Sequence, residues 1–183
     1  MGRLNHQNTY YLAGTINEEA IKNLASWLIS EKRVLEEKIF LVVSSGGGRV
    51  ASGFACVDLL LASESAAKLT TVGVGRVDSM AIPIFLAGNE RIISPRTNLF
   101  FHEFCKTFEK EVSFSTTELG KAIEGMQQDQ RVYAEFVSTR TSGKMSPENV
   151  LDLMKKETMI NAADAIKLGL AHTILNKENL LLP

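Results

Sequence analysis

The sequence predicts an α/β fold in which helices cover a parallel β-sheet. The run 39–43 is entirely apolar and the run 69–74 is mainly apolar, as expected for strands that are covered on both faces. Each run leads into a glycine-containing turn and then into a helical segment, at 50–62 and 80–87. A repeated order of strand, turn and helix is typical of parallel sheets with right-handed crossovers.

The other elements follow from local patterns. The segment 10–13 is a short strand ending at Gly14, and Asn17 is the N-cap of a helix from 18 to about 31. Downstream we expect strands at 90–93, 99–101 and 171–175 and helices at about 117–139, 147–156 and 162–168. No linker or repeat interrupts the 183 residues, so we expect one domain over residues 1–183.

Composition argues against several classes of protein. The chain has 20 basic and 21 acidic residues, so no charge excess points to nucleic acid or to an anionic membrane. The polar N-terminus lacks the apolar core of a signal peptide, and His6 stands where a myristoylation signal needs Ser or Thr. The longest apolar run, 80–87, is too short to span a bilayer. Cys56 and Cys105 suggest no disulfide framework, so we expect a reducing, cytoplasmic compartment.

The candidate chemistry centres on Ser79 and His102. Ser79 lies in the turn between an apolar strand and an apolar helix, where a hydroxyl can be exposed to substrate. A serine needs a base to remove its proton, and His102 ends the next strand. The pair predicts a serine hydrolase if the two side chains meet. The alternatives are a helix-capping serine, which is common, and a core or edge histidine.

Two backbone amides are candidate oxyanion donors. The Met80 N–H lies at the start of a helix, where N–H groups lack helical partners. Gly47, within the run Gly46-Gly47-Gly48, can turn its N–H toward a ligand. The alternatives are a tight strand-to-helix turn and a phosphate loop, although the Gly-Lys-Ser/Thr of such loops is missing.

The other titratable side chains have weaker assignments. Glu157 lies at a helix-to-strand junction and could orient the histidine, or it could be a solvated acid paired with a neighbouring lysine. Cys105 is an alternative nucleophile, but no glycine turn or helix start activates it. His6 and His172 are the other histidines, and the sequence contains no metal-binding pattern. We therefore expect no metal or cofactor.

The helix at 117–139 carries an apolar seam with alternating gaps of four and three residues, typical of a helix that packs against a partner helix. Its positions are Leu119, Ile123, Met126, Gln130, Tyr133 and Val137. If the seam is intermolecular, charged residues at Met126 and Tyr133 should break the contact. The alternative is an amphipathic helix on its own core, with Gln130 at an exposed edge.

Taken in order, these elements resemble the proteolytic subunit of Clp protease, within the Clp/crotonase-like fold. The resemblance extends from about Leu12 to Leu175 and rests on the order and spacing of several motifs. They are Gly14-Thr15-Ile16-Asn17, Ser45-Gly46-Gly47-Gly48-Arg49-Val50-Ala51-Ser52-Gly53, Ser79-Met80-Ala81, Leu86-Ala87-Gly88, Ser94-Pro95-Arg96-Thr97-Asn98 with His102, and 162–170.

The resemblance implies repeated β-β-α units, a head at about 10–105 and 145–176, and a protruding handle helix at about 115–140. By position, Ser79 resembles the family nucleophile and His102 its base, and Glu157 stands where an aspartate is usual. Gly47 and Met80 fall at the oxyanion-hole amides. Family members cleave peptides and unfolded proteins inside two stacked seven-membered rings, without a cofactor, and are usually fed by a hexameric AAA+ unfoldase. We therefore predict a serine endopeptidase.

The sequence departs from the family pattern around the predicted site. Gly46 replaces a usual proline, and Arg76-Val77-Asp78 replaces small residues before the serine. A carboxylate at Asp78 would oppose an oxyanion unless Arg76 pairs with it or it faces away. The segment 106–110 replaces a glycine-rich stretch that pairs with substrate. These departures motivate a second hypothesis, a catalytically silent or weak ring subunit. A third is a crotonase-type acyl-CoA enzyme that uses the Gly47 region as an oxyanion hole.

Overall fold

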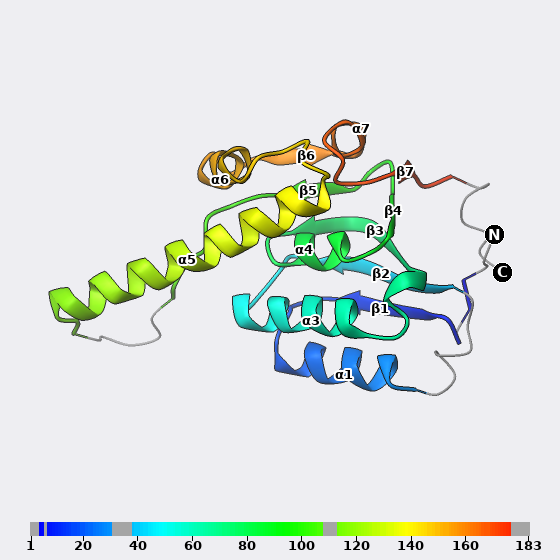
Figure 1. The fold of residues 1–183 in the computed structure, drawn as a ribbon, viewed down its shortest axis with the longest axis horizontal. Coiled ribbons are helices and arrows are strands. Elements are labelled where there is room, and N and C mark those ends of the chain that lie inside the picture. The colour runs from blue at the N-terminus through cyan, green and yellow to red at the C-terminus, as the bar shows by residue number, and fades with distance from the viewer. Residues whose placement is uncertain (1–3, 6, 31–37, 108–112, 177–183) are drawn as a thin grey trace.

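A forked, largely parallel sheet organises the fold (Figure 1). The computed structural model describes residues 4–5, 7–30, 38–107 and 113–176. Parallel strands lie side by side in the order β1 (Thr9–Ala13), β2 (Ile39–Ser45), β3 (Leu69–Asp78), β4 (Glu90–Ile93) and β7 (Thr173–Ile174).

The fork lies in β3. Residues 70–73 of β3 pair with β4, whereas residues 76–78 pair with β5 (Asn98–Phe100), also in parallel. β6 (Met159–Asn161) then pairs with β5 and is antiparallel to it. The branch of β5 and β6 therefore begins next to the carboxyl end of β3, immediately before Ser79.

Helices pack against the sheet and against one another. α1 (Glu18–Leu28) begins at Asn17, whose side chain accepts a hydrogen bond from the Ala20 N–H at 3.0 Å. α1 packs against α3 (Val50–Ala62), and α3 packs against α4 (Ala81–Leu86). α6 (Pro147–Lys155) and α7 (Ala162–Lys167) lie near β5 and β6 (Figure 1). A short 3-10 turn, Ala66–Lys68, precedes β3.

The core has two parts on opposite faces of the sheet. The larger part joins β-strand residues such as Leu41, Val77 and Leu99 to the helices. The smaller part lies on the other face and consists of Leu4, Phe40, Val42, Val72 and Ile92. Because side chains alternate along a strand, the neighbours of Val77 and Leu99 face this second side.

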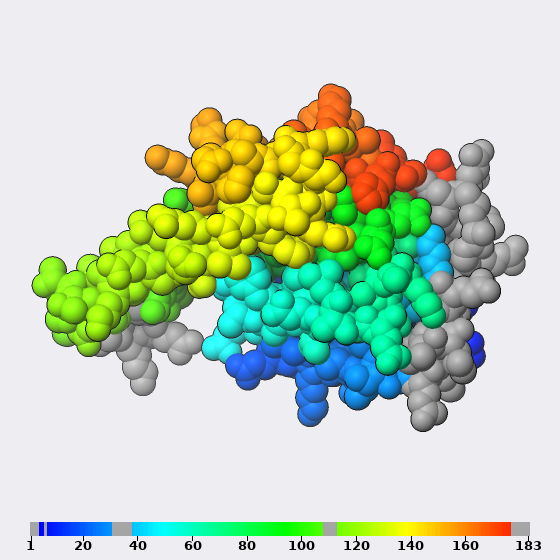
Figure 2. Space-filling view, in the orientation of Figure 1, coloured from blue at the N-terminus to red at the C-terminus, as the bar shows by residue number. Residues whose placement is uncertain are grey.

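The longest helix, α5 (Thr116–Arg140), is only partly embedded in the molecule. Its C-terminal part buries Tyr133, Ala134 and Val137, whereas its N-terminal part projects from the head (Figures 1 and 2). The side chains of Leu119 and Ile123 are 46% and 49% exposed. The predicted seam is therefore divided, since its C-terminal positions belong to the core of this chain.

The predicted α/β architecture is confirmed, with three local differences. β3 extends four residues beyond the predicted end and reaches Asp78. The short strand β6 was not expected from the pattern and makes the sheet locally antiparallel. α1 ends at Leu28, and the predicted helix end at 31 lies outside the described residues. His6 and residues 108–110, which belong to the segment that departs from the family pattern, lie outside them as well.

Candidate active site

Ser79 lies in the turn that joins β3 to α4, and only 7% of the residue is exposed. Its N–H donates to the Phe100 carbonyl oxygen at 2.9 Å. Its own carbonyl oxygen accepts from the Ile82 N–H at 3.0 Å and from the Tyr133 hydroxyl at 3.4 Å. Among the described residues, no group is hydrogen-bonded to the Ser79 hydroxyl. The backbone is therefore held while the hydroxyl is left available.

The backbone of Ser79 is left-handed, with φ 54°. Among the described residues other than glycine, only Ser142 and Glu157 share this conformation. Both complete a helix C-terminus, where a left-handed residue is ordinary: Ser142 N–H donates to Thr139 O and Glu157 N–H to Met154 O. Ser79 has no such role. A left-handed residue costs about 1–3 kcal/mol and is typical of functional sites.

The glycine loop after β2 packs directly against this turn. A Cβ atom on Gly47 would lie 2.6 Å from Ser79 Cβ and 3.1 Å from Met80 N. A Cβ atom on Gly48 would collide with the Ile16 backbone on the other side. Glycine is therefore required at both positions by close approach, which brings the predicted oxyanion region beside the serine.

The candidate oxyanion amides differ in their partners. The Gly47 N–H donates to Ser45 Oγ at 3.0 Å. Among the described residues, no hydrogen bond uses the N–H of Met80 or that of Gly48. Gly48 itself lies against the Ile16 backbone, whereas Gly47 lies against Ser79. Of the two predicted donors, Met80 therefore has an amide that the described residues leave without a hydrogen-bond partner next to Ser79.

His102 follows β5, the strand that pairs with the end of β3 just before the Ser79 turn. β5 pairs in parallel with β3, with Phe100 opposite Asp78, and Ser79 bonds to Phe100. The imidazole stacks on the Phe100 ring at 5.5 Å and 27°. His102 Nδ1 lies 2.7 Å from the Glu103 carbonyl oxygen. Because a carbonyl can only accept, this bond requires a proton on Nδ1 and leaves Nε2 of the neutral ring as the base.

Glu157 lies two residues before β6, the strand that pairs with β5. Phe100 pairs with Met159, and the Phe101 N–H donates to Thr158 O at 2.9 Å. His102 and Glu157 each lie one residue beyond this bond, but Glu157 is left-handed at the end of α6 and does not belong to the ladder. The Glu157 side chain is exposed. Among the described residues, no hydrogen bond or ion pair joins Glu157 to His102, or His102 to Ser79.

Asp78 is buried next to the serine, but it is paired. The Arg76 Nε and Nη2 atoms lie 2.6 Å and 2.5 Å from Asp78 Oδ2. The two side chains face away from the main core, since Val77 between them belongs to it. A Cβ atom on Gly46 would lie 3.1 Å from the Arg76 guanidinium. Gly46 and the Arg76–Asp78 pair are therefore one structural unit, in which arginine compensates the carboxylate.

The chain matches a known protein family over most of its length. The family model described as Clp protease matches residues 1–178. The chain belongs to the Clp protease family.

Individual relatives are distant. The chain is 24% identical over 177 residues to the ATP-dependent Clp protease proteolytic subunit 2 of Gluconobacter oxydans, covering 96% of this chain and 77% of that protein. It is 28% identical over 127 residues to the ATP-dependent Clp protease proteolytic subunit of Pleurastrum terricola, covering 68% and 64%. The solved structure of a ClpP1 mutant from Listeria monocytogenes is similar, with a TM-score of 0.78, 20% identity and 94% of both chains covered. This likeness shows that the chain has the Clp/crotonase-like fold.

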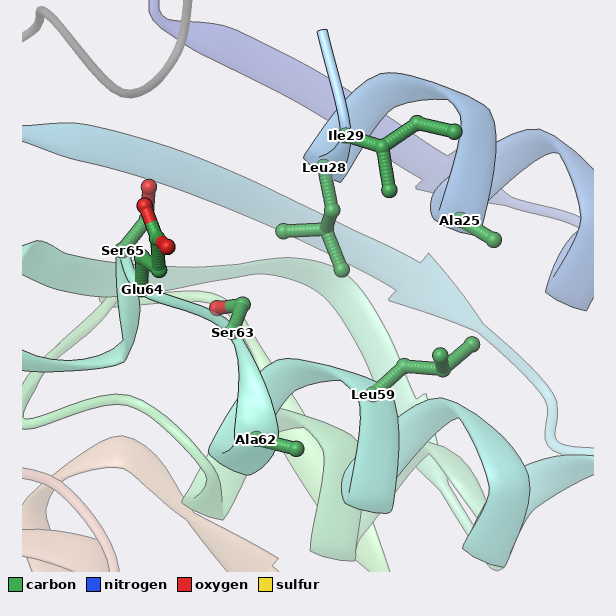
Figure 3. Close-up of a pocket in the computed structure, with 8 residues that line it drawn as sticks. All are labelled: Ala25, Leu28, Ile29, Leu59, Ala62, Ser63, Glu64 and Ser65. Atoms are coloured by element: carbon green, nitrogen blue, oxygen red, sulfur yellow. The ribbon is translucent and has the colours of Figure 1, made fainter.

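Two hollows lie away from Ser79 itself. One, of about 890 Å³, is lined by Gly48 and Arg49 on one side and by Cys105 and Lys106 on the other. It therefore adjoins both the glycine loop and the segment after His102. The other, of about 460 Å³, lies between α1 and α3, and the predicted site residues do not line it. Figure 3 shows its mainly apolar lining, which consists of Ala25, Leu28, Ile29, Leu59, Ala62, Ser63, Glu64 and Ser65.

The remaining sequence candidates are dispersed. Cys56 is buried, and burial raises its thiol pKa to about 11. Cys105 is exposed, three residues after His102. Within the described ranges, no group of three His, Cys, Asp or Glu side chains could hold a metal ion. In the same part of the chain, no helix is long and apolar enough to cross a membrane.

Sequence reasoning missed two polar contacts around the Ser79 turn and the segment after His102. Gln130 and Tyr133 were assigned to a helix seam, yet Gln130 accepts from the Phe104 N–H at 3.2 Å and Tyr133 contacts Ser79. Their apolar spacing was a correct packing signal, but it carried no information about the polar groups that they reach.

Proposed function

We propose that this member of the Clp protease family is a serine endopeptidase that hydrolyses peptides and unfolded proteins. Family membership supports a peptidase, and one observation favours the serine type. The strained Ser79 turn is followed by a Met80 amide to which the described part of the chain offers no hydrogen-bond partner. The family match also favours this interpretation over an acyl-CoA enzyme.

In the proposed reaction, Ser79 Oγ attacks the scissile carbonyl carbon while His102 Nε2 takes the hydroxyl proton. The Met80 N–H stabilises the oxyanion, together with a Gly47 N–H released from Ser45. His102 then protonates the leaving amine, and water attacks the acyl-enzyme with His102 as its base. Each step uses groups that this chain supplies.

Glu157 has the role of orienting His102. Its place in the chain supports this role, because Glu157 and His102 each lie one residue beyond the Phe101–Thr158 hydrogen bond that joins their two segments. The reaction requires the His102 Nδ1–H to leave the Glu103 carbonyl and donate to the Glu157 carboxylate. Catalytic hydrogen bonds in ligand-free proteins are often longer than in the reacting complex, so such an adjustment is compatible with activity.

We further propose that the working form is a homo-oligomer of heptameric rings stacked in pairs, located in the cytoplasm. The projecting part of α5 supports this assembly, since Leu119 and Ile123 expose apolar surface that a partner helix would bury. Feeding by an AAA+ unfoldase is part of the same proposal. The relatives from Gluconobacter oxydans and Pleurastrum terricola are named ATP-dependent.

A catalytically silent ring subunit is the second candidate. It is favoured by the missing hydrogen bonds among the triad side chains in the described structure and by the engagement of the Gly47 N–H with Ser45. A silent subunit would assemble normally but would turn over no substrate.

Hydrolysis of fluorogenic peptides and of an unfolded protein separates the two candidates. We expect turnover that falls by at least about 10³-fold in Ser79→Ala, because the nucleophile is lost. Light scattering of the same samples reports assembly. A well-folded ring that hydrolyses none of these substrates, with or without Ser79, would favour the silent subunit.

A further inference from the structure

The embedded part of α5 reaches both halves of the proposed site. Tyr133 is 1% exposed, and its hydroxyl donates to the Ser79 carbonyl oxygen at 3.4 Å. Its ring meets Phe101 edge-on, with centroids 6.4 Å apart, and Phe104 edge-on at 5.6 Å. One buried side chain therefore touches the serine turn and the residues on either side of His102.

Gln130 adds a polar contact one turn earlier on the same helix. Its Oε1 atom accepts from the Phe104 N–H at 3.2 Å. Phe104 lies two residues after His102, in a segment without regular secondary structure. That N–H has no strand partner, so Gln130 holds a part of the backbone that the β5 ladder does not reach.

The same helix also holds the far end of α4. Arg140 donates to the Leu86 and Gly88 carbonyl oxygens at 2.6 Å and 2.7 Å. All six residues of α4 are buried, and the helix begins two residues after Ser79. α5 thus contacts the nucleophile's helix at both ends, through Tyr133 and Arg140.

Ser79 needs such support, because its left-handed backbone persists only where surrounding contacts fix it. Burial raises the pKa of the Tyr133 hydroxyl well above its ordinary value of 10, so the hydroxyl remains a donor. Aromatic edge-to-face contacts add rigidity that a flexible side chain would not supply.

We propose that Gln130 and Tyr133 are positioning residues that fix the Ser79 turn and the His102 segment relative to each other. This inference rests on the proposed function. Neither side chain touches the reacting atoms. Both act through Ser79 and through the backbone that carries His102.

The test compares Tyr133→Phe and Gln130→Ala with the wild-type protein. Tyr11→Phe and Gln128→Ala are matched controls, because both side chains are exposed. Gln130→Glu keeps an acceptor oxygen for the Phe104 N–H and serves as the conservative rescue. The readouts are kcat and KM for a short peptide, the rate of labelling by a fluorophosphonate per folded molecule, and hydrogen exchange at 79–82 and at Phe104.

We expect kcat and the labelling rate to fall about 10-fold in both variants, with KM changed less than about twofold, since small misplacements of reacting groups lower the rate strongly. The rate of backbone amide hydrogen exchange should rise at residues 79–82 in Tyr133→Phe and at Phe104 in Gln130→Ala. Gln130→Glu and the two controls should match the wild type.

Failure of this inference and failure of the proposed function give different results. Unchanged labelling per folded molecule and unchanged exchange in both variants would overturn the positioning role while leaving the serine peptidase intact. A wild-type protein that never labels, but whose variants show the local rise in exchange, would support the positioning role and contradict the proposed chemistry.

Discussion

The three consecutive glycines after β2 each lie against a different neighbour. Gly46 lies against the Arg76 guanidinium, Gly47 against Ser79 Cβ, and Gly48 against the Ile16 backbone. This loop is therefore more than a flexible turn between a strand and a helix. The serine turn packs directly against this loop, so contact with neighbouring atoms disfavours any larger residue at the three glycine positions.

We predict that Gly47→Ala abolishes labelling of Ser79, because the new methyl would lie 2.6 Å from Ser79 Cβ and must displace the turn. Gly143→Ala is the matched control: φ at Gly143 is also positive, at 73°, but no atom lies within 4 Å of its Cβ position. Labelling rate and thermal midpoint are measured for both. Equal effects of the two substitutions would mean that backbone strain alone, and not contact with Ser79, explains the loss.

The Arg76–Asp78 pair leads to a second prediction. Arg76→Ala leaves the buried Asp78 carboxylate without its arginine, so the free energy of unfolding should fall by about 1–2 kcal/mol. The labelling rate of Ser79 should fall as well, because an uncompensated negative charge beside the oxyanion opposes its formation.

The double variant Arg76→Ala/Asp78→Ala should recover most of both losses. Urea unfolding and labelling kinetics report the two effects. If the single and double variants behave alike, the arginine does not act by compensating Asp78.

At the level of single residues, local sequence patterns were enough to propose candidate site residues. The turn between an apolar strand and an apolar helix singled out Ser79 and Met80, the next strand and a helix-to-strand junction offered His102 and Glu157, and family resemblance assigned the roles of all four. Whether Arg76 compensates Asp78 could not be decided, because the two side chains share a face only if the strand continues past the predicted end at Val74 to Asp78. The triad assignment itself remains a prediction.

Among the elements, α5 combines two environments in a single helix. Its C-terminal part is core, whereas its N-terminal part leaves the apolar side chains of Leu119 and Ile123 about half exposed. A charged residue at Tyr133 would disrupt the core of the head and would not report on a partner helix. The seam positions that can test assembly are therefore the exposed ones.

We predict that Leu119→Asp and Ile123→Asp lower the assembled mass without unfolding the chain. Burial of the exposed half of each side chain in a helix–helix contact contributes about 0.7–1.5 kcal/mol, which a carboxylate would remove. Gln128→Asp places the same charge on an exposed polar position of α5 and should leave the mass unchanged. Light scattering measures the mass, and retention of the wild-type mass in both seam variants would argue against an α5 interface.

The elements that the sequence missed share a physical cause. β6 has three residues and is formed by pairing with β5, so it has no periodic pattern of its own. The end of β3 contains Gly75, Arg76 and Asp78, which break the apolar run although the chain remains extended. Helices and buried strands were predictable, because their apolar periodicity is local.

At the scale of the whole molecule, distant segments converge on Arg91. This side chain is 5% exposed and donates to the carbonyl oxygens of Gly88, Arg140, Gly169 and Leu170. These carbonyls lie at or just beyond the C-terminal ends of α4, α5 and α7, where helix dipoles favour a cation. Burial lowers the Arg91 pKa to about 10, so it is charged at neutral pH.

This cluster predicts a pH dependence through His172, whose Nδ1 accepts from the Arg91 N–H at 3.3 Å and must be unprotonated to do so. Burial lowers the His172 pKa below its ordinary value of 6.5, helped by Arg91, Arg140 and Lys144 and opposed by Glu90. The unfolded chain therefore binds this proton more readily. Stability should be lost as the pH falls below about 6.5, with the loss complete below the folded pKa.

The measurement is the thermal midpoint of wild type and His172→Gln between about pH 5 and about pH 8. Glutamine keeps an acceptor for the Arg91 N–H but does not titrate. The wild-type midpoint should fall more steeply toward acid pH. Parallel curves would show that His172 is not responsible.

The central claim is that Ser79 is a nucleophile activated by His102. Fluorophosphonate treatment followed by mass spectrometry of the digested protein tests it most directly, with Ser79→Ala and His102→Ala alongside. We predict a single adduct on the peptide that contains Ser79, lost in both variants. A folded protein that carries no adduct where a reference serine hydrolase reacts, or one modified at another residue such as Cys105, would contradict the claim.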